Sequence, residues 1–179
     1  MEEYKILFLC HGNICRSPMA EFIMKDLVRQ AGMEDCFFIR SAAVSREEIG
    51  NDLYPPARRS LDRHKIPWEH RRARQITAED FAAFDLIVYM DASNLRYLNY
   101  YFNPSLRRFG RKVRPLLLEP LPGQPEGFIP REVADPWYTG DFEITFRDLS
   151  EGCARLLREL TETETYDKTE KDSWMPPRE

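Results

Sequence analysis

The chain has 179 residues, 42% of them hydrophobic and 31% charged, which is typical of a globular domain with a buried core. Its formal net charge of −4 argues against a general affinity for nucleic acid. The apolar runs fall far short of the roughly 20 residues that a membrane-spanning helix needs, and the acidic start MEEYKILFLC is unlike a signal peptide. The four cysteines lack the spacing of a disulfide framework. We therefore expect a cytoplasmic protein that binds neither nucleic acid nor a membrane.

Short apolar strands alternate with amphipathic helices along most of the chain. The predicted strands are residues 4–9, 37–39, 85–90 and 113–118, and the predicted helices are residues 18–31, 57–64, 77–84, 92–101 and 141–160. This alternation predicts right-handed βαβ units on a parallel sheet. In such sheets, sites form at the carboxyl ends of the strands.

Polar residues mark the starts of three helices. Ser17 followed by Pro18 predicts an N-cap hydroxyl and a proline at the first helical position. Thr77 and Asp80 have the spacing of a reciprocal capping pair, and Asp91 is placed to cap the helix that follows it.

The composition changes near residue 160. Residues 161–179 are polar and charged and contain two prolines close to their end. We therefore predict one domain over residues 1–160, followed by a flexible tail over residues 161–179.

The first predicted strand ends on Cys10, and a short loop connects it to Arg16 and a helix. Gly12 and Asn13 suit a sharply curved loop, because glycine lacks a side chain and asparagine tolerates left-handed backbone. Loop N–H groups, a helix N-terminus and the planar guanidinium of Arg16 can together bind a phosphate dianion. The same setting favours the thiolate, so we predict that Cys10 attacks phosphorus and forms a cysteinyl-phosphate. The hydroxyl of Ser17 is a candidate donor to the sulfur when that intermediate is hydrolysed.

A leaving alkoxide or phenoxide needs a proton, so a carboxylic acid should lie near the phosphate. The segment ADPWYTGDF offers Asp135 after the last predicted strand, and Pro136 stiffens the turn. Trp137 and Tyr138 follow as aromatic walls. Alone, an Asp-Pro pair indicates only a turn. Together with the cysteine loop, it makes Asp135 the predicted general acid.

The segment CHGNICRSP matches the C-x-G-N-x-C-R-S-P signature of the low-molecular-weight protein tyrosine phosphatases. The chain also resembles this family in SAAVS (41–45), ARQIT (73–77), FDLIVYMDASNLRYLN (84–99) and DPWYTGDFE (135–143), over nearly all of residues 6–160. The resemblance implies a three-layer, flavodoxin-like α/β fold of the phosphotyrosine phosphatase I-like type, with a four-stranded parallel sheet and helices on both faces. It also implies hydrolysis of phosphotyrosine without a metal or another cofactor.

The resemblance assigns roles to the matching positions. It implies Cys10 as the nucleophile, Arg16 as the phosphate clamp and Asp135 as the general acid. The expected phosphate-binding and supporting residues are His11, Gly12, Asn13, Ile14, Cys15, Ser17 and Ser41, and the expected substrate pocket contains Tyr54, Trp137 and Tyr138. Cys15 either forms a reversible, protective disulfide with Cys10 under peroxide or packs beneath the loop. The implied partners are phosphotyrosine-containing proteins, with a tyrosine kinase among the candidates, and the implied state is a monomer or weak homodimer.

Two positions depart from the family's pattern. A histidine often stands just before the ARQIT segment, but His70 lies one residue further upstream, so His70 and Arg71 are both candidates for the active-site network. Glu47 stands where family members often have an aromatic pocket wall, and Tyr54 is a candidate replacement for that wall.

Three other functions share parts of this pattern. Phosphoarginine phosphatases of the same family have a threonine in place of Ile14, whose apolar side chain suits a phenol ring. Thioredoxin-coupled arsenate reductases need further cysteines, and residues 82–98 contain none. A phosphotyrosine-binding module would not need Cys10 and Asp135 together. The sequence thus favours phosphotyrosine hydrolysis, with phosphoarginine hydrolysis as the alternative and arsenate reduction behind it.

Overall fold

The computed structural model describes residues 3–117 and 130–173, with side chains described as far as residue 162. Four strands form one parallel sheet in the order β2-β1-β3-β4. They are β1 (Tyr4–Cys10), β2 (Phe37–Ala43), β3 (Leu86–Tyr89) and β4 (Val113–Pro115). Because β1 has a parallel neighbour on each side, its last residue, Cys10, lies at the middle of the sheet's carboxyl edge.

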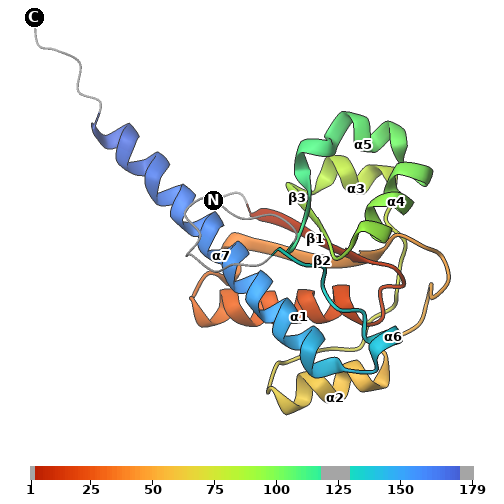
Figure 1. The fold of residues 1–179 in the computed structure, drawn as a ribbon. Coiled ribbons are helices and arrows are strands. Elements are labelled where there is room, and N and C mark those ends of the chain that lie inside the picture. Colours follow the sequence, from red (N-terminus) through yellow and green to blue (C-terminus); the bar gives the residue numbers. More distant parts are fainter. Residues whose placement is uncertain (1–2, 118–129, 174–179) are drawn as a thin grey trace, which may run out of the picture.

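Helices cover both faces of this sheet. On one face lie α1 (Arg16–Gln30) and α7 (Phe142–Ser173), with α2 (Pro55–Arg63) beside α7 (Figure 1). On the other lie α3 (Ala78–Ala83), α4 (Ala92–Tyr101) and α5 (Asn103–Phe109). The short elements are η1 (Glu34–Cys36), η2 (Gly110–Lys112) and α6 (Pro136–Thr139). The predicted three-layer α/β fold is confirmed.

Strand β1 is buried on both faces, which explains its continuous apolar sequence. Ile6 and Phe8 belong to the core beneath α1 and α7, whereas Leu7 and Leu9 belong to the core beneath α3, α4 and α5. All four side chains have an exposed fraction of 0%. The strand is therefore a rigid support for the loop that follows it.

Several local predictions hold, and others need correction. The capping pairs at the starts of α3 and α4 are both present. Helix α1, however, begins at Arg16 with Cys15 as its N-cap residue, so Ser17 is not the N-cap. Strand β2 continues to Ala43, past the predicted end at residue 39, so Ser41 lies within the strand. The short helices α5 and α6 were not predicted at all.

The C-terminal helix is longer than the sequence pattern suggests. The backbone of α7 is helical from Phe142 to Ser173, past the boundary predicted at residue 160, and the division into domain and tail stays a prediction. The sequence also predicts a loop over residues 119–135, rich in proline and glycine. Most of these residues, and the end of the strand predicted at 113–118, lie outside the described residues. Within the described part of the chain, no helix combines the length and apolar character that crossing a bilayer requires.

Candidate active site

The loop after β1 curves around the sulfur of Cys10. Asn13 has a φ angle of 59°, the left-handed backbone that the sequence predicts there. Its N–H donates to Cys10 Sγ at 3.3 Å. A Cβ atom on Gly12 would lie 3.0 Å from Glu48 Cγ, so the missing side chain of Gly12 makes room for Glu48. The loop therefore turns a backbone donor toward the thiol.

A buried hydrogen-bond network lies behind this loop. Asn13 Nδ2 donates to Ser17 Oγ at 2.9 Å and to Ser41 Oγ at 3.0 Å. Ser17 Oγ also lies 3.0 Å from Cys10 Sγ, which explains why Ser17 serves the thiol and not the helix N-terminus. Ser41 Oγ donates to Glu21 Oε2 at 2.6 Å. The sequence predicts every member of this network except Glu21, a buried carboxylate of α1.

Arg71, and not His70, contacts the network. Arg71 Nη1 donates to the backbone oxygen of Asn13 at 2.6 Å, and Nη2 donates to Asn13 Oδ1. The N–H of Arg74 also donates to Asn13 Oδ1, at 3.2 Å. His70 instead pairs with Asp52, and its side chain is 76% exposed. Of the two candidates, the structure therefore places Arg71 against the loop.

Arg16 is buried between two carboxylates. Its Nη1 lies 2.6 Å from Asp91 Oδ2, and its Nη2 lies 2.9 Å from Asp135 Oδ2. Burial alone lowers the pKa of Arg16, but Cys10, Asp135 and Asp91 outweigh this effect and raise its pKa above the usual value. Asp91 also accepts from the N–H of Asn94 at the start of α4, as its predicted role as a cap requires. Its contact with Arg16 was not predicted.

Asp135 is the N-cap residue of α6 and accepts from the N–H of Trp137 at 3.1 Å. The aromatic side chains after it face outward, with Trp137 57% and Tyr138 86% exposed. The ring of Tyr54 lies 5.6 Å from the ring of Trp137, centroid to centroid. Tyr54 thus supports Trp137 from a neighbouring hollow and does not line the cavity over Cys10.

A cavity of about 310 Å³ lies over the thiol. The predicted residues that line it are Cys10, His11, Gly12, Ile14, Cys15, Arg16, Asp135, Trp137 and Tyr138. The lining also includes Glu47, Glu48, Asp91, Ser93, Asn94 and Tyr97. The described residues thus bring the predicted nucleophile, clamp and acid to one hollow.

Cys15 lies in the same lining, with an exposed fraction of 6%. Burial, followed by the negative charges of Cys10 and Asp135, raises the pKa of Cys15 well above its ordinary value. Cys15 is therefore a protonated thiol at neutral pH. Both it and Cys10 are free cysteines in the structure, and a disulfide between them stays a prediction.

Comparison with known proteins identifies this arrangement. The family model described as low molecular weight phosphotyrosine protein phosphatase matches residues 5–166. The chain belongs to this family. The human low molecular weight phosphotyrosine protein phosphatase is 41% identical over 157 residues, which cover 88% of this chain and 93% of the human protein.

Bacterial phosphatases of the family are similar in sequence and in structure. The crystal structure of YfkJ from Bacillus subtilis matches with a TM-score of 0.80 and 32% identity, over 91% of this chain and 98% of that chain. The low molecular weight protein tyrosine phosphatase SP-PTP from Streptococcus pyogenes matches with a TM-score of 0.75 and 35% identity, over 92% of this chain and 97% of its own. These neighbours confirm the flavodoxin-like fold. Family membership makes the chain a protein-tyrosine phosphatase, an enzyme of the hydrolase class.

Several side chains of this phosphatase's site are not among the predicted site residues. Glu48, Ser93 and Asn94 line the cavity, Glu21 lies in α1, Asp91 is the N-cap of α4 and Tyr97 lies in the middle of α4. For Asp91 a signal did exist, because it directly follows the strand predicted at 85–90 and so stands at a carboxyl end, as Cys10 does. Glu21 and Tyr97 follow ordinary helical spacing and carry no such signal.

Proposed function

We propose that this phosphatase hydrolyses phosphotyrosine in proteins through a cysteinyl-phosphate on Cys10, without a metal. The observation that carries the proposal is that Cys10, Arg16 and Asp135 line one cavity together with apolar and aromatic side chains. A thiol, a buried guanidinium and a carboxyl group are the three groups that the two transfer steps need.

In the first step, the thiolate of Cys10 attacks phosphorus, and an S–P bond forms as the bond to the phenol oxygen breaks. Arg16 holds two phosphoryl oxygens through its planar fork. Because Arg16 already contacts Asp135, an arriving phosphate displaces that carboxyl group from the guanidinium and leaves it beside the phenol oxygen. Asp135 in its acid form then gives its proton to the leaving phenoxide.

In the second step, Asp135 as carboxylate takes a proton from water, and the water oxygen attacks phosphorus. The S–P bond breaks, and the sulfur leaves as a thiolate. Ser17 Oγ, which is 3.0 Å from the sulfur, donates a hydrogen bond to it. Asn13 Nδ2 donates to the oxygen of the same hydroxyl, which leaves the hydroxyl proton for the sulfur or for the backbone oxygen of Ala42, 3.3 Å away.

The lining of the cavity favours an aryl phosphate. The side chain of Ile14 is apolar and 9% exposed, and it shares the lining with Trp137 and Tyr138. A phenol ring packs against these apolar and aromatic side chains, whereas Ile14 itself offers no acceptor to the N–H groups of a phosphorylated guanidinium, for which the carboxylates of the lining are the available acceptors. Phosphoarginine hydrolysis is therefore the alternative to exclude by assay. A cytoplasmic location, a tyrosine kinase among the partners, and a monomeric or weakly dimeric state stay predictions.

The test compares peptides that carry phosphotyrosine, phosphoserine or phosphoarginine, with purified protein under reducing conditions. We expect turnover of phosphotyrosine, and its absence would refute the proposal. Cys10→Ser should abolish hydrolysis while inorganic phosphate still binds. Asp135→Asn should lower kcat about 10²–10⁴-fold for poor leaving groups and less for good ones. Equal losses for both would contradict the role of Asp135 as acid. Glu34→Gln, an exposed change in η1, is the matched carboxylate control.

A further inference from the structure

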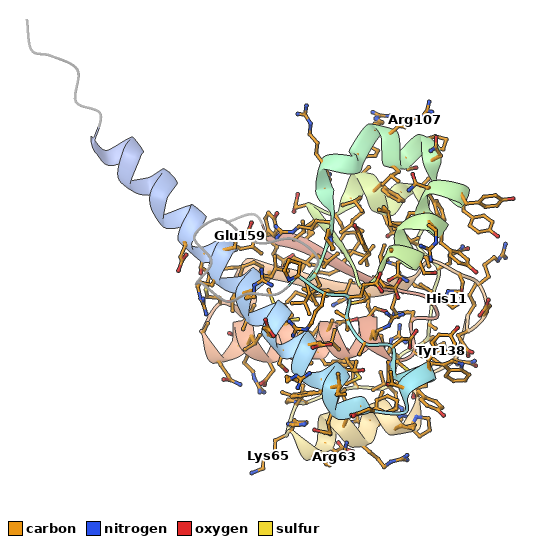
Figure 2. The ribbon with its side chains drawn as sticks, in the orientation of Figure 1. His11, Arg63, Lys65, Arg107, Tyr138 and Glu159 are labelled. Carbon is orange, nitrogen blue, oxygen red and sulfur yellow. The ribbon has the colours of Figure 1, made fainter. Side chains whose placement is uncertain are left out.

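Part of the rim of the cavity above Cys10 combines two acidic side chains with one aromatic side chain. Glu47 and Glu48 come from the loop after β2, and Tyr97 comes from α4. His11 lies between them, with its ring 5.0 Å from the ring of Tyr97 and edge-on to it. Figure 2 shows His11 on the same side of the molecule as Tyr138 of α6. We refer to Glu47, Glu48, His11 and Tyr97 as the acidic rim.

Within the cavity, positive charge is already compensated. Arg16 is the only lysine or arginine among the described residues that line it. Asp91 and Asp135 contact its two terminal nitrogens at 2.6 and 2.9 Å. In this structure the other two carboxylates of the lining, Glu47 and Glu48, are therefore not the ones that neutralise the Arg16 guanidinium.

The two glutamates of the acidic rim have partners that bring no permanent charge. Glu47 Oε2 lies 2.9 Å from His11 Nε2, and the Glu47 side chain is 64% exposed. Glu48 Oε2 accepts from the neutral amide of Asn51 at 2.6 Å. The rim thus presents carboxylates next to the hollow that receives a phosphate dianion. The negative charge of the rim therefore repels the negative charge of the incoming phosphate.

We propose that the acidic rim is a subsite for a lysine or arginine side chain next to the phosphotyrosine of the substrate. This inference rests on the proposed function and names the class of peptide that it prefers. A flanking cation pairs with Glu47 or Glu48 and packs over the ring of Tyr97. It also offsets the repulsion between the rim and the incoming phosphate. An acidic flanking residue would add to that repulsion.

The expected preference follows from exposed contacts and is moderate. A surface ion pair and an exposed cation–π contact together favour the basic peptide, and the acidic peptide is disfavoured by like charges, so kcat/KM should differ on the order of tenfold. Because the contacts are near solvent, the preference should shrink at high ionic strength.

The experiment uses phosphotyrosine peptides that differ only in one flanking residue, which is Arg, Ala or Glu. One set carries it on the N-terminal side of the phosphotyrosine and a second set on the C-terminal side. We expect kcat/KM to fall in the order Arg, Ala, Glu in at least one set. Turnover of all peptides at equal kcat/KM, or a preference for Glu, would overturn the subsite and leave the proposed function standing. Failure to turn over any phosphotyrosine peptide would refute both.

Variants then locate the preference. The readout is the ratio of kcat/KM for the Arg and Glu peptides within each variant, so a change in overall activity does not affect it. The double change Glu47→Gln, Glu48→Gln should lower this ratio strongly, and Tyr97→Leu should lower it to a smaller extent. The matched controls are Glu34→Gln and Tyr100→Leu, since Tyr100 is 81% exposed on α4 outside the lining. A ratio that persists in the double variant, or that falls equally in the controls, would overturn the assignment.

Discussion

Arg71 offers a direct test of how the phosphate-binding loop keeps its shape. It donates to two oxygens of Asn13, the residue of the loop that holds left-handed backbone. That backbone costs most residues with a side chain about 1–2 kcal/mol, and asparagine tolerates it better than most. Arg71→Ala removes the two donors, so Asn13 should leave this conformation more often and withdraw its N–H from Cys10.

The size of the effect can be worked out from these contacts. A hydrogen bond from a charged donor contributes about 1.5–3 kcal/mol net. The N–H of Arg74 still reaches Asn13 Oδ1, at 3.2 Å, and Arg71 is partly exposed, so water replaces part of what is lost. We expect a net loss of about 2 kcal/mol, which corresponds to roughly 30-fold in kcat/KM.

The assay measures kcat/KM on an aryl phosphate for Arg71→Ala, Arg71→Lys and the control Arg72→Ala, which changes an exposed neighbour. Lysine should recover part of the loss, because its ammonium lacks the planar fork that serves both oxygens. Thermal unfolding, recorded in parallel, separates a displaced loop from a loss of the fold. If Arg71→Ala stays within threefold of Arg72→Ala, Arg71 does not hold the loop.

Three further predictions concern packing, acid stability and oxidation. A Cβ on Gly152 would lie 2.4 Å from Leu116 Cγ, so Gly152→Ala should lower the free energy of unfolding by about 1–3 kcal/mol in denaturant titrations, whereas Gly110→Ala, with open space at its Cβ, should not. Asp52 has its pKa lowered to about 2, because hydrogen bonds from neighbouring groups outweigh burial. The ionised Asp52 carboxylate thus stabilises the fold above about pH 4, and this contribution is lost as the pH falls through 2. The free energies of unfolding of the parent and Asp52→Asn should therefore differ by about 1 kcal/mol at pH 6 and converge near pH 2. Cys15→Ser should make inactivation by peroxide less reversible by thiols; unchanged recovery would argue against a protective disulfide.

The fold was predictable because most of its elements carry a local signal. The strands are short apolar runs, the longer helices show helical apolar spacing, and the 6-residue α3 has a capping pair. In contrast, α5, with 7 residues, has no side-chain N-cap, and α6, with 4 residues, starts with an Asp-Pro pair that alone indicates only a turn. The start of α1 was misplaced for another reason. Ser17 followed by Pro18 is a favourable local helix start, but the Ser17 hydroxyl lies against Cys10 and Asn13, so a tertiary contact overrides the local preference.

The candidate site was predictable where its chemistry is visible in a short segment. Cys10 and Arg16 flank a single loop. Asp135 lies far away in the sequence, and the chemical need for an acid indicated it. Asp91 was not found because its role depends on strand order. It follows β3, and only because β3 pairs with β1 does the end of β3 come beside Cys10. Local patterns locate each strand but do not say which strands are neighbours. A residue that directly follows any strand of a parallel sheet is therefore a site candidate until the pairing is known, even when a helix cap already explains it.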